Sequence, residues 1–160
     1  MRATAGLGDR SGGPATPAAD LWTCPRCGRT FANRNQSHTC AALGDLDSHF
    51  AGADPAVRAT FDRILAELGP VDVLAEKSRI ALHVRMSFAA FMPRKHWLDG
   101  HLVLAREARH PLFRRIQTFS QRNVLHEFRI SSPEQIDDAF IALLHEAYEV
   151  GQQHHLGRAP

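Results

Sequence analysis

Hydrophobic residues recur with a helical period at two places in this chain, separated by a stretch with a different period. The first place begins after Asp54-Pro55, a cap and a first-turn proline, and ends at Gly69-Pro70. The second begins at the capping-box sequence Ser132-Pro133-Glu134-Gln135 and ends at Gly151. Both patterns predict amphipathic helices, with the apolar stripes Val57, Phe61, Ile64, Leu65 and Leu68, and Ile136, Ala139, Phe140, Leu143, Leu144, Ala147 and Val150.

Between the predicted helices the hydrophobic period changes to two, which is typical of half-buried β-strands. Residues 79–88 alternate regularly between apolar and polar side chains, and we expect them to form one strand that continues to Phe91. Residues 96–105 contain Asp99-Gly100, a dipeptide that indicates a hairpin turn or a bulge between two strand-like halves. The central part of the chain is therefore predicted to be a sheet.

Residues 113–119 and 123–130 complete this sheet as two more strands joined by a short polar turn. The predicted fold class is α+β over residues 50–152, with an antiparallel sheet of four or five strands flanked by an N-terminal and a C-terminal helix. The two helices are expected to cover one face of the sheet. A length of 160 residues with 44% hydrophobic residues supports one modest core of this kind and a small metal-held module.

The segments outside the predicted core lack its periodicity. Residues 1–20 are rich in Gly, Ala, Pro and Thr and lack the apolar stretch of a signal peptide, so we expect a disordered tail. Residues 153–160 are expected to form a second tail, and residues 41–53 a linker. No run approaches the ~20 apolar residues of a membrane span. We therefore expect a cytoplasmic protein without a membrane segment, in which thiols stay reduced.

All three cysteines lie in one short segment with the spacing C-x2-C-x10-H-x-C. The predicted metal ligands are Cys24, Cys27, His38 and Cys40. Three thiolates and one imidazole complete a tetrahedral zinc shell, and Gly28 lets the backbone turn so that amides face the thiolates. Because protein side chains fill all four places, the pattern predicts a structural Zn²⁺ ion in a knuckle over residues 21–41.

Other interpretations of the cysteine cluster fit less well. A redox dithiol at the C-x-x-C pair would need a strand before it and a helix after it, whereas the polar residues 32–37 indicate a loop. A disulfide framework requires an oxidising compartment and cannot pair three cysteines internally. The single residue between the histidine and the last cysteine is short for a zinc-finger pair, which leaves His49 as an alternative ligand.

The net charge of +2 is unevenly distributed along the chain. Residues 1–41 carry five basic and two acidic residues, a net charge of +3, and residues 74–130 carry eleven and four, a net charge of +7. Residues 42–73 and 131–160 each carry −4. A basic block of this kind attracts anionic partners, although 17 arginines against two lysines also indicate a coding bias toward arginine.

The basic block contains a candidate anion-binding face. Its predicted residues are Arg79, His83, Arg85, Arg106 and Arg129. If residues 79–88 form one strand, the first three share its polar side and the other two lie on neighbouring strands. The set predicts either a solvated sheet face or a site for phosphates or a small acidic ligand. Phe88 and Phe128 fall on the apolar side, which disfavours an aromatic platform for single-stranded nucleic acid.

Known enzyme motifs are missing from the chain, which favours a non-catalytic protein. It contains no G-x-S-x-G, Walker A or G-x-G-x-x-G sequence and no His-x-Glu pattern of a deaminase. Asp72 and Glu76-Lys77 lack the acid-x-Lys spacing of nuclease sites.

Two single side chains also lead to expectations. His126 is in phase with the apolar residues of its strand, so we expect it in the core rather than in a pocket. Tyr148 is expected to line a groove.

Several of these stretches resemble a known family. Cys24-Pro25-Arg26-Cys27-Gly28-Arg29-Thr30-Phe31 and Gln36-Ser37-His38-Thr39-Cys40 resemble a zinc-binding leader found on some bacterial proteins. Over roughly residues 21–155 the chain is similar to domain-of-unknown-function family 5655, in Asp54-Pro55-Ala56-Val57-Arg58, Arg85-Met86-Ser87-Phe88, Trp97-Leu98-Asp99-Gly100-His101-Leu102-Val103-Leu104, Ile130-Ser131-Ser132-Pro133 and the closing helix through Ala147-Tyr148. The resemblance implies a fold and four metal ligands but no known activity. Related domains found beside nuclease-like modules imply a link to nucleic-acid biology.

Three functions remain open from the sequence. The first is a binding module for nucleic acid or another polyanion, with the knuckle as an auxiliary contact. The second is a domain that binds a small anion or other small ligand in a pocket between the sheet and the C-terminal helix. The third is a protein-interaction module. A contiguous basic surface over knuckle and sheet would favour the first, and a concave pocket with convergent His and Arg side chains the second.

Overall fold

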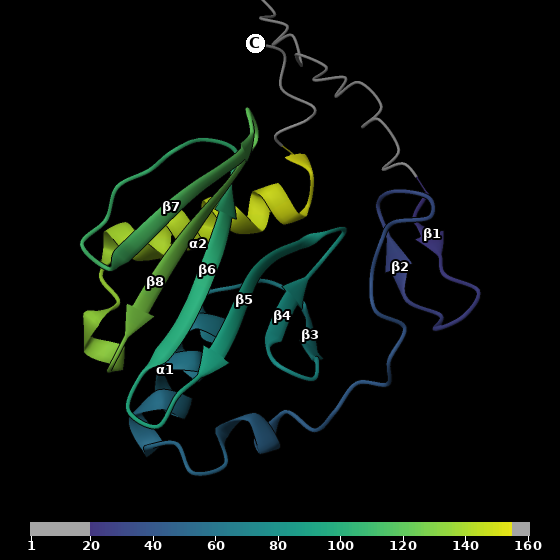
Figure 1. Ribbon diagram of the computed structural model, residues 1–160. Coiled ribbons are helices and arrows are strands. Elements are labelled where there is room, and N and C mark those ends of the chain that lie inside the picture. Colours follow the sequence, from purple (N-terminus) through teal and green to yellow (C-terminus); the bar gives the residue numbers. More distant parts are fainter. Residues whose placement is uncertain (1–19, 155–160) are drawn as a thin grey trace, which may run out of the picture.

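The centre of the fold is a six-stranded antiparallel sheet with the strand order β3-β4-β5-β6-β8-β7 (Figure 1). This computed structural model describes residues 20–154. The strands are β3 (Asp72–Ala75), β4 (Ile80–His83), β5 (Ser87–Pro93), β6 (Leu98–Leu104), β7 (Phe113–Ser120) and β8 (Asn123–Ile130). The predicted α+β class is confirmed, but the sheet has six strands where four or five were expected. The predicted tails lie outside the described residues, apart from Asp20, Gln153 and His154.

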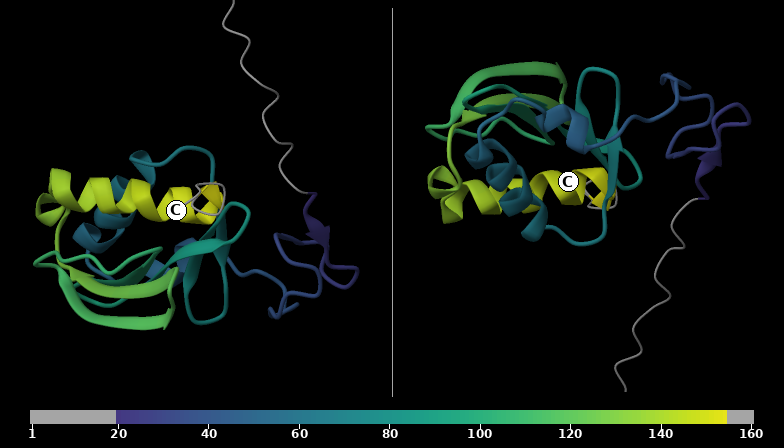
Figure 2. Two further views of the ribbon diagram at one scale, coloured as in Figure 1. Left: turned by 90° about the horizontal axis from the view of Figure 1, so that it is seen from above. Right: turned by 90° about the horizontal axis from the view of Figure 1, so that it is seen from below.

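Two helices cover one face of this sheet, as predicted (Figure 2). They are α1 (Pro55–Ala66) and α2 (Asp138–Gly151). In β6, Leu98, Leu102 and Leu104 are fully buried in the core, whereas Asp99, His101 and Val103 between them are partly exposed. Phe61 of α1 and Phe140 of α2 are fully buried in the same core. The alternation in β6 therefore separates a face packed on the helices from a face that solvent reaches.

Residues 79–88 form two strands rather than the single strand predicted for them. β4 and β5 pair as a hairpin, with a turn at residues 84–86 between them. The end of α2 holds this turn, because the backbone N–H groups of Arg85 and Met86 donate to the carbonyl oxygen of Gly151 at 3.2 and 3.0 Å. The alternating pattern does not reveal the turn, since the acceptor that fixes it comes from a distant part of the chain.

β6 runs without interruption through Asp99-Gly100, where a hairpin or a bulge was predicted. The turn lies earlier, at residues 94–97, where the N–H of Arg94 donates to the carbonyl oxygen of Trp97 at 2.8 Å. Gly100 serves close packing instead: a Cβ there would lie 2.6 Å from Cζ of Phe128 and 2.8 Å from the carbonyl oxygen of Ala90. The glycine therefore marks a close approach of neighbouring strands and not a turn.

The second helix begins later than its capping box predicted. Ser132 and Gln135 do form a capping box, but it starts the short 3-10 turn η2 (Pro133–Gln135). α2 then begins after Asp137, whose carboxylate accepts a hydrogen bond from the N–H of Phe140 at 2.7 Å. Two successive caps divide one predicted helix into a turn and a helix, and α2 ends at Gly151 as predicted.

The first helix begins at Pro55 as predicted, but the residue before it has another role. The Asp54 side chain makes no capping hydrogen bond to α1. Its carboxylate lies 2.7 Å from Nδ1 of His96, in the turn between β5 and β6, and its N–H donates to the carbonyl oxygen of Lys95 at 2.7 Å. The start of α1 is therefore attached to a sheet turn.

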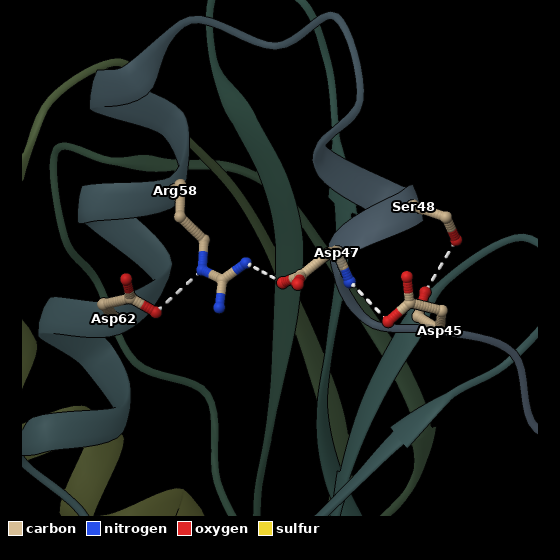
Figure 3. Close-up of polar contacts among 5 residues, drawn as sticks. All are labelled: Asp45, Asp47, Ser48, Arg58 and Asp62. Atoms are coloured by element: carbon tan, nitrogen blue, oxygen red, sulfur yellow. Dashed lines mark hydrogen bonds and ion pairs between the residues drawn. The ribbon is translucent and has the colours of Figure 1, made fainter.

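The segment predicted as a linker, residues 41–53, is attached to α1 (Figure 3). It contains the 3-10 turn η1 (Asp47–Phe50), whose first N–H donates to the carboxylate of Asp45 at 3.2 Å. The Arg58 guanidinium of α1 bonds Asp62 on its own helix at 3.0 Å and Asp47 on η1 at 2.6 Å. Because both ion pairs are exposed, they add little stability, and only the pair of Arg58 with Asp47 joins η1 to α1.

His126 lies in the core, as its phase in the strand predicted, and is fully buried. Its Nε2 accepts a hydrogen bond from the N–H of Ala108 at 2.9 Å, so its Nδ1 carries the proton and donates to the carbonyl oxygen of Val124 at 3.0 Å. Burial lowers the pKa of His126. Tyr148, for which a groove was predicted, instead packs on the core and donates its hydroxyl to the carbonyl oxygen of Pro70 at 2.8 Å.

Candidate metal centre

The cysteine segment folds as a small hairpin beside the main sheet (Figure 1). Its strands are β1 (Trp22–Thr23) and β2 (Thr30–Phe31), and the loop between them carries Cys24 and Cys27. The loop closes through hydrogen bonds from the N–H of Gly28 to the oxygen of Cys24 at 2.9 Å and from the N–H of Cys24 to the oxygen of Arg29 at 2.8 Å. Gly28 has a φ of +73°, a left-handed conformation that glycine adopts without strain, as the predicted turn requires.

Four side chains from this loop and from the segment after β2 converge. They are Cys24, Cys27, His38 and Cys40, and one ligand atom of each lies within 4.8 Å of the others. Nε2 of His38 is 3.3 Å from the Cys27 sulfur and 3.4 Å from the Cys40 sulfur, while the sulfurs of Cys24 and Cys40 are 3.8 Å apart. The structure thus brings together the four residues chosen from their spacing. His49 lies in η1 and does not belong to the group.

The donor set and its spacing fit a tetrahedral zinc ion. Zn–S bonds of about 2.3 Å and a Zn–N bond of about 2.0 Å place two sulfurs about 3.8 Å apart, and a sulfur and a nitrogen about 3.5 Å apart. Three of the six separations between the four ligand atoms, 3.8, 3.3 and 3.4 Å, agree with that geometry to about 0.2 Å, and all six lie within 4.8 Å. Thiolate and imidazole ligands also suit zinc chemically, so this group could hold the ion.

Backbone N–H groups favour the thiolate form at the first two cysteines. The N–H of Arg29 has the largest influence on Cys27 and lowers the pKa of its thiol to about 6. At Cys24 burial acts to raise the pKa, but the N–H groups of Cys27 and Arg26 outweigh it, so the pKa is lowered. At Cys40 burial and the neighbouring thiols raise the pKa. The C-x-x-C loop therefore favours the deprotonated state that metal ligands require.

The histidine of the group is oriented by its surroundings. Nδ1 of His38 bonds the carbonyl oxygen of Gln36 at 2.6 Å, which leaves Nε2 to face the thiols. The same carbonyl raises the pKa of His38. The ring centre of His38 lies 4.1 Å from that of Phe31 and 6.2 Å from that of Trp22, so both aromatic side chains pack at the site.

The knuckle contacts the main sheet through His83, one of the residues predicted to bind anions. Its Nε2 donates to the carbonyl oxygen of Thr30 at 3.1 Å, and its ring makes an edge contact with Phe31. The N–H of Ala32 donates to the carbonyl oxygen of Arg85 at 3.1 Å. His83 is 4% exposed, and burial lowers its pKa. These contacts give His83 a structural role between the knuckle and the β4–β5 hairpin.

The five residues of the predicted anion-binding face are not gathered on one surface. Three of the arginines are paired with carboxylates: Arg79 with Glu76 at 2.7 Å, Arg106 with both oxygens of Glu146 at 2.8 and 2.9 Å, and Arg129 with Asp99 at 2.7 Å. His83 lies at the knuckle contact, and Arg85 lies in the β4–β5 turn. The prediction of a common strand face was wrong, because residues 79–88 form two strands joined by a turn.

A different group of arginines is exposed and has no carboxylate partner. Within residues 20–154, Arg114 and Arg115 of β7 and Arg122 of the turn to β8 form no ion pair. We call these three the hairpin arginines. A signal for them exists in the sequence, because residues 108–126 contain four arginines and no Asp or Glu. Charge summed over the longer segment 74–130 concealed this run.

His101, on the partly exposed face of β6, makes the stability of the fold dependent on pH. Burial, reinforced by the positive charge of Arg79, lowers its pKa to about 4, against about 6.5 in an unfolded chain. Between these two pH values the unfolded chain therefore binds more protons at this group than the folded chain does. The free energy of unfolding is highest above pH 6.5 and decreases as the pH falls toward 4. We expect this group to lower the free energy of unfolding by about 2 kcal/mol between pH 7.5 and 5.

Urea denaturation at the two pH values checks this expectation, with His101→Gln as the comparison. The variant lacks the titrating imidazole but keeps the other ionisable groups, so it should lose about 2 kcal/mol less than the wild-type chain on acidification. Equal losses in both proteins would mean that His101 keeps an ordinary pKa.

The fold and the cysteine cluster define a small α+β protein with a group of one histidine and three cysteines that could bind a metal ion. The model of the family named domain of unknown function (DUF5655) matches residues 46–151, and the chain belongs to this family. The match begins within the predicted linker, just before η1, and it does not include the knuckle. Searches of curated proteins and of solved structures found no significant match. No helix in residues 20–154 is long and apolar enough to cross a membrane.

Proposed function

We propose that the chain is a non-catalytic, zinc-stabilised module that binds nucleic acid through the hairpin arginines. The observation that carries this proposal is the cationic β7–β8 hairpin, whose three exposed arginines have no carboxylate partner within residues 20–154. A guanidinium group matches the geometry of a phosphate and can bond it with two N–H groups. Contacts of this kind supply affinity for a nucleic-acid backbone without reading its sequence.

A hollow beside the hairpin supports the proposal. Its volume is about 380 Å³, and its lining residues are Glu107, Arg109, Phe113, Arg114, Arg115, Ile116 and Thr118. Glu107 is paired with Arg109 at 2.9 Å, whereas Arg114 and Arg115 in the lining form no ion pair, with Glu127 of β8 opposite Arg115 in the strand register. β7 is the last strand of the sheet, so the hollow lies at an edge that a long polyanion can reach.

The histidine and cysteine group is proposed to hold a structural zinc ion. Four protein ligands fill a tetrahedral shell, so the ion would have no open position for a substrate. The knuckle is too short to bury a core, and the metal would supply most of its folding free energy. In this proposal the ion keeps β1 and β2 folded and thereby keeps Thr30 and Phe31 in contact with His83 on the sheet.

The small-ligand alternative is less well supported. It requires a pocket between the sheet and α2, but that space is occupied by the buried side chains of Phe128, Phe140, Leu144 and Ala147. A filled core cannot admit a ligand without repacking. The exposed hairpin therefore has the stronger case as a binding surface.

Binding to oligonucleotides at two salt concentrations tests the proposed function. We expect weak, sequence-tolerant binding whose affinity falls steeply with salt, because each arginine–phosphate contact releases a condensed counterion. The combined variant Arg114→Ala, Arg115→Ala and Arg122→Ala should lower the slope of log K against log salt by about 2 to 3. Fluorescence anisotropy with a labelled oligonucleotide measures both quantities.

Arg106→Ala is the matched control for this experiment. It removes one exposed arginine that is already neutralised by Glu146, so binding should change little. Absence of binding even at low salt, or an unchanged salt slope in the triple variant, would rule out the hairpin as a nucleic-acid site.

A further inference from the structure

Phe119 is a large hydrophobic side chain that the fold leaves in solvent. It is 65% exposed, and within the described part of the chain its ring packs against no other aromatic ring. Its neighbours Thr118, Ser120 and Gln121 are also exposed. Phe119 does not belong to the hydrophobic core, so the packing of the domain does not require an aromatic residue at this position.

Phe119 lies at an irregularity in the pairing of β7 with β8. Thr118 is paired with Val124 and Ser120 with Asn123, so Phe119 lies at the register shift and has no cross-strand partner. Bulges re-aim side chains and often occur at sheet edges beside functional sites. The last three residues of β7 are all exposed, so Phe119 lies at a strand end that the core does not cover.

Arginine residues precede and follow Phe119 in the sequence. Arg115 precedes it on the same strand, and Arg122 follows it in the turn that begins β8. Both arginines are exposed and lack a carboxylate partner within residues 20–154. Arg115 lies opposite Glu127 in the β7–β8 register but forms no ion pair with it. An exposed aromatic ring flanked in the sequence by two exposed arginines combines a stacking surface for a base with contacts for the adjoining phosphates.

We infer that the β7–β8 hairpin selects single-stranded nucleic acid, with one unpaired base stacked on Phe119 and the backbone held by Arg115 and Arg122. This inference rests on the proposed function and adds the class of nucleic acid to it. A base in a duplex already stacks on its neighbours, and it can reach the ring only after it leaves the helix, which is costly. An unpaired base meets no such barrier, and the stacking depends little on its identity.

The experiment compares the zinc-loaded chain of 160 residues with its Phe119→Ala and Phe119→Trp variants. The probes are a labelled oligothymidylate of about 12 nucleotides and a mixed-sequence duplex of the same length. Phe119→Ala should weaken binding of the single strand about tenfold and leave the duplex affinity and the salt slope unchanged. Phe119→Trp keeps a stacking surface and should bind the single strand at least as well as the wild-type chain.

Leu43→Ala is the matched control, because Leu43 is the other exposed large hydrophobic residue described, at 42% exposure, and it lies far from the hairpin in sequence. It should leave both affinities unchanged. Equal weakening of single strand and duplex by Phe119→Ala, or no weakening of either, would overturn the inference while leaving the proposed function intact. If the wild-type chain bound no oligonucleotide even at low salt, the proposed function itself would be wrong. Binding of phosphatidylserine vesicles instead of the oligothymidylate would assign the hairpin to a membrane surface and overturn the inference.

Discussion

Replacing Cys27 with serine is expected to reduce the zinc content of the purified chain from about one ion per molecule to almost none. The Cys27 thiol has a pKa lowered to about 6 and lies 3.3 Å from Nε2 of His38, so it is well placed to act as a thiolate ligand. A serine hydroxyl does not deprotonate under these conditions and is a poor zinc ligand. Elemental analysis after gel filtration measures the change.

His49→Ala is the control for this prediction, because His49 lies in η1 and outside the ligand group. It should retain the zinc content of the wild-type chain. A Cys40→Ser protein with intact zinc affinity, together with a His49→Ala protein that had lost it, would transfer the fourth ligand position to His49.

Metal removal should affect mainly the knuckle. We propose that residues 50–152 keep their fold without zinc, because the sheet, both helices and the core residues between them lie in this range. The contacts between knuckle and sheet, such as His83 with Thr30, are few by comparison. Chelation should therefore leave most of the far-ultraviolet circular dichroism signal unchanged, and a cooperative loss of the whole signal would contradict the proposed division.

Phe61→Ala is expected to lower the free energy of unfolding by about 3 to 5 kcal/mol. Phe61 is fully buried, and its ring centre lies 5.3 Å from that of Phe50 and 5.4 Å from that of Phe91. Truncation removes these contacts and leaves a cavity where η1, α1 and β5 meet. Since domains of this size are stable by about 5 to 15 kcal/mol, the loss would be a large fraction of the total.

Phe119→Ala provides a chemically identical control. The same atoms are removed, but from a side chain that is 65% exposed, so the free energy of unfolding should change by less than about 0.5 kcal/mol. Urea denaturation of both variants at one pH, with zinc present, measures the difference. Similar losses in the two proteins would mean that Phe119 belongs to the core, and this outcome would also weaken its assignment as a stacking surface.

The features that local sequence predicted well are those with local physical causes. β8 was predicted over its full length, because its alternating residues lie on a sheet with one buried face. The apolar stripes of α1 and α2 were predicted from their period, and the four members of the metal group from their spacing. β3 was not predicted, because four residues with one buried side chain carry too little periodicity.

The turn between β4 and β5, the continuity of β6 and the pairing of the arginines were decided only by tertiary structure. Alternation in residues 79–88 suits one strand or two equally well, and the carbonyl oxygen of Gly151 favours the turn. Asp99-Gly100 suits a hairpin or a close approach of strands, and Phe128 and Ala90 occupy the space beside it.

By itself, the sequence determined where hydrophobic faces, metal-ligand side chains and net charge lie along the chain, because these depend on residue type and spacing. Only the tertiary structure decided which arginines are neutralised and which ring is exposed. Arg106 and Glu146 are far apart in sequence and meet only when α2 packs on the sheet, whereas Phe119 lies at the exposed end of β7, where the pairing with β8 is irregular. The effect of a charge depends on its distance from other charges, and the effect of a hydrophobic side chain depends on its burial. Distance and burial are set by the folded chain.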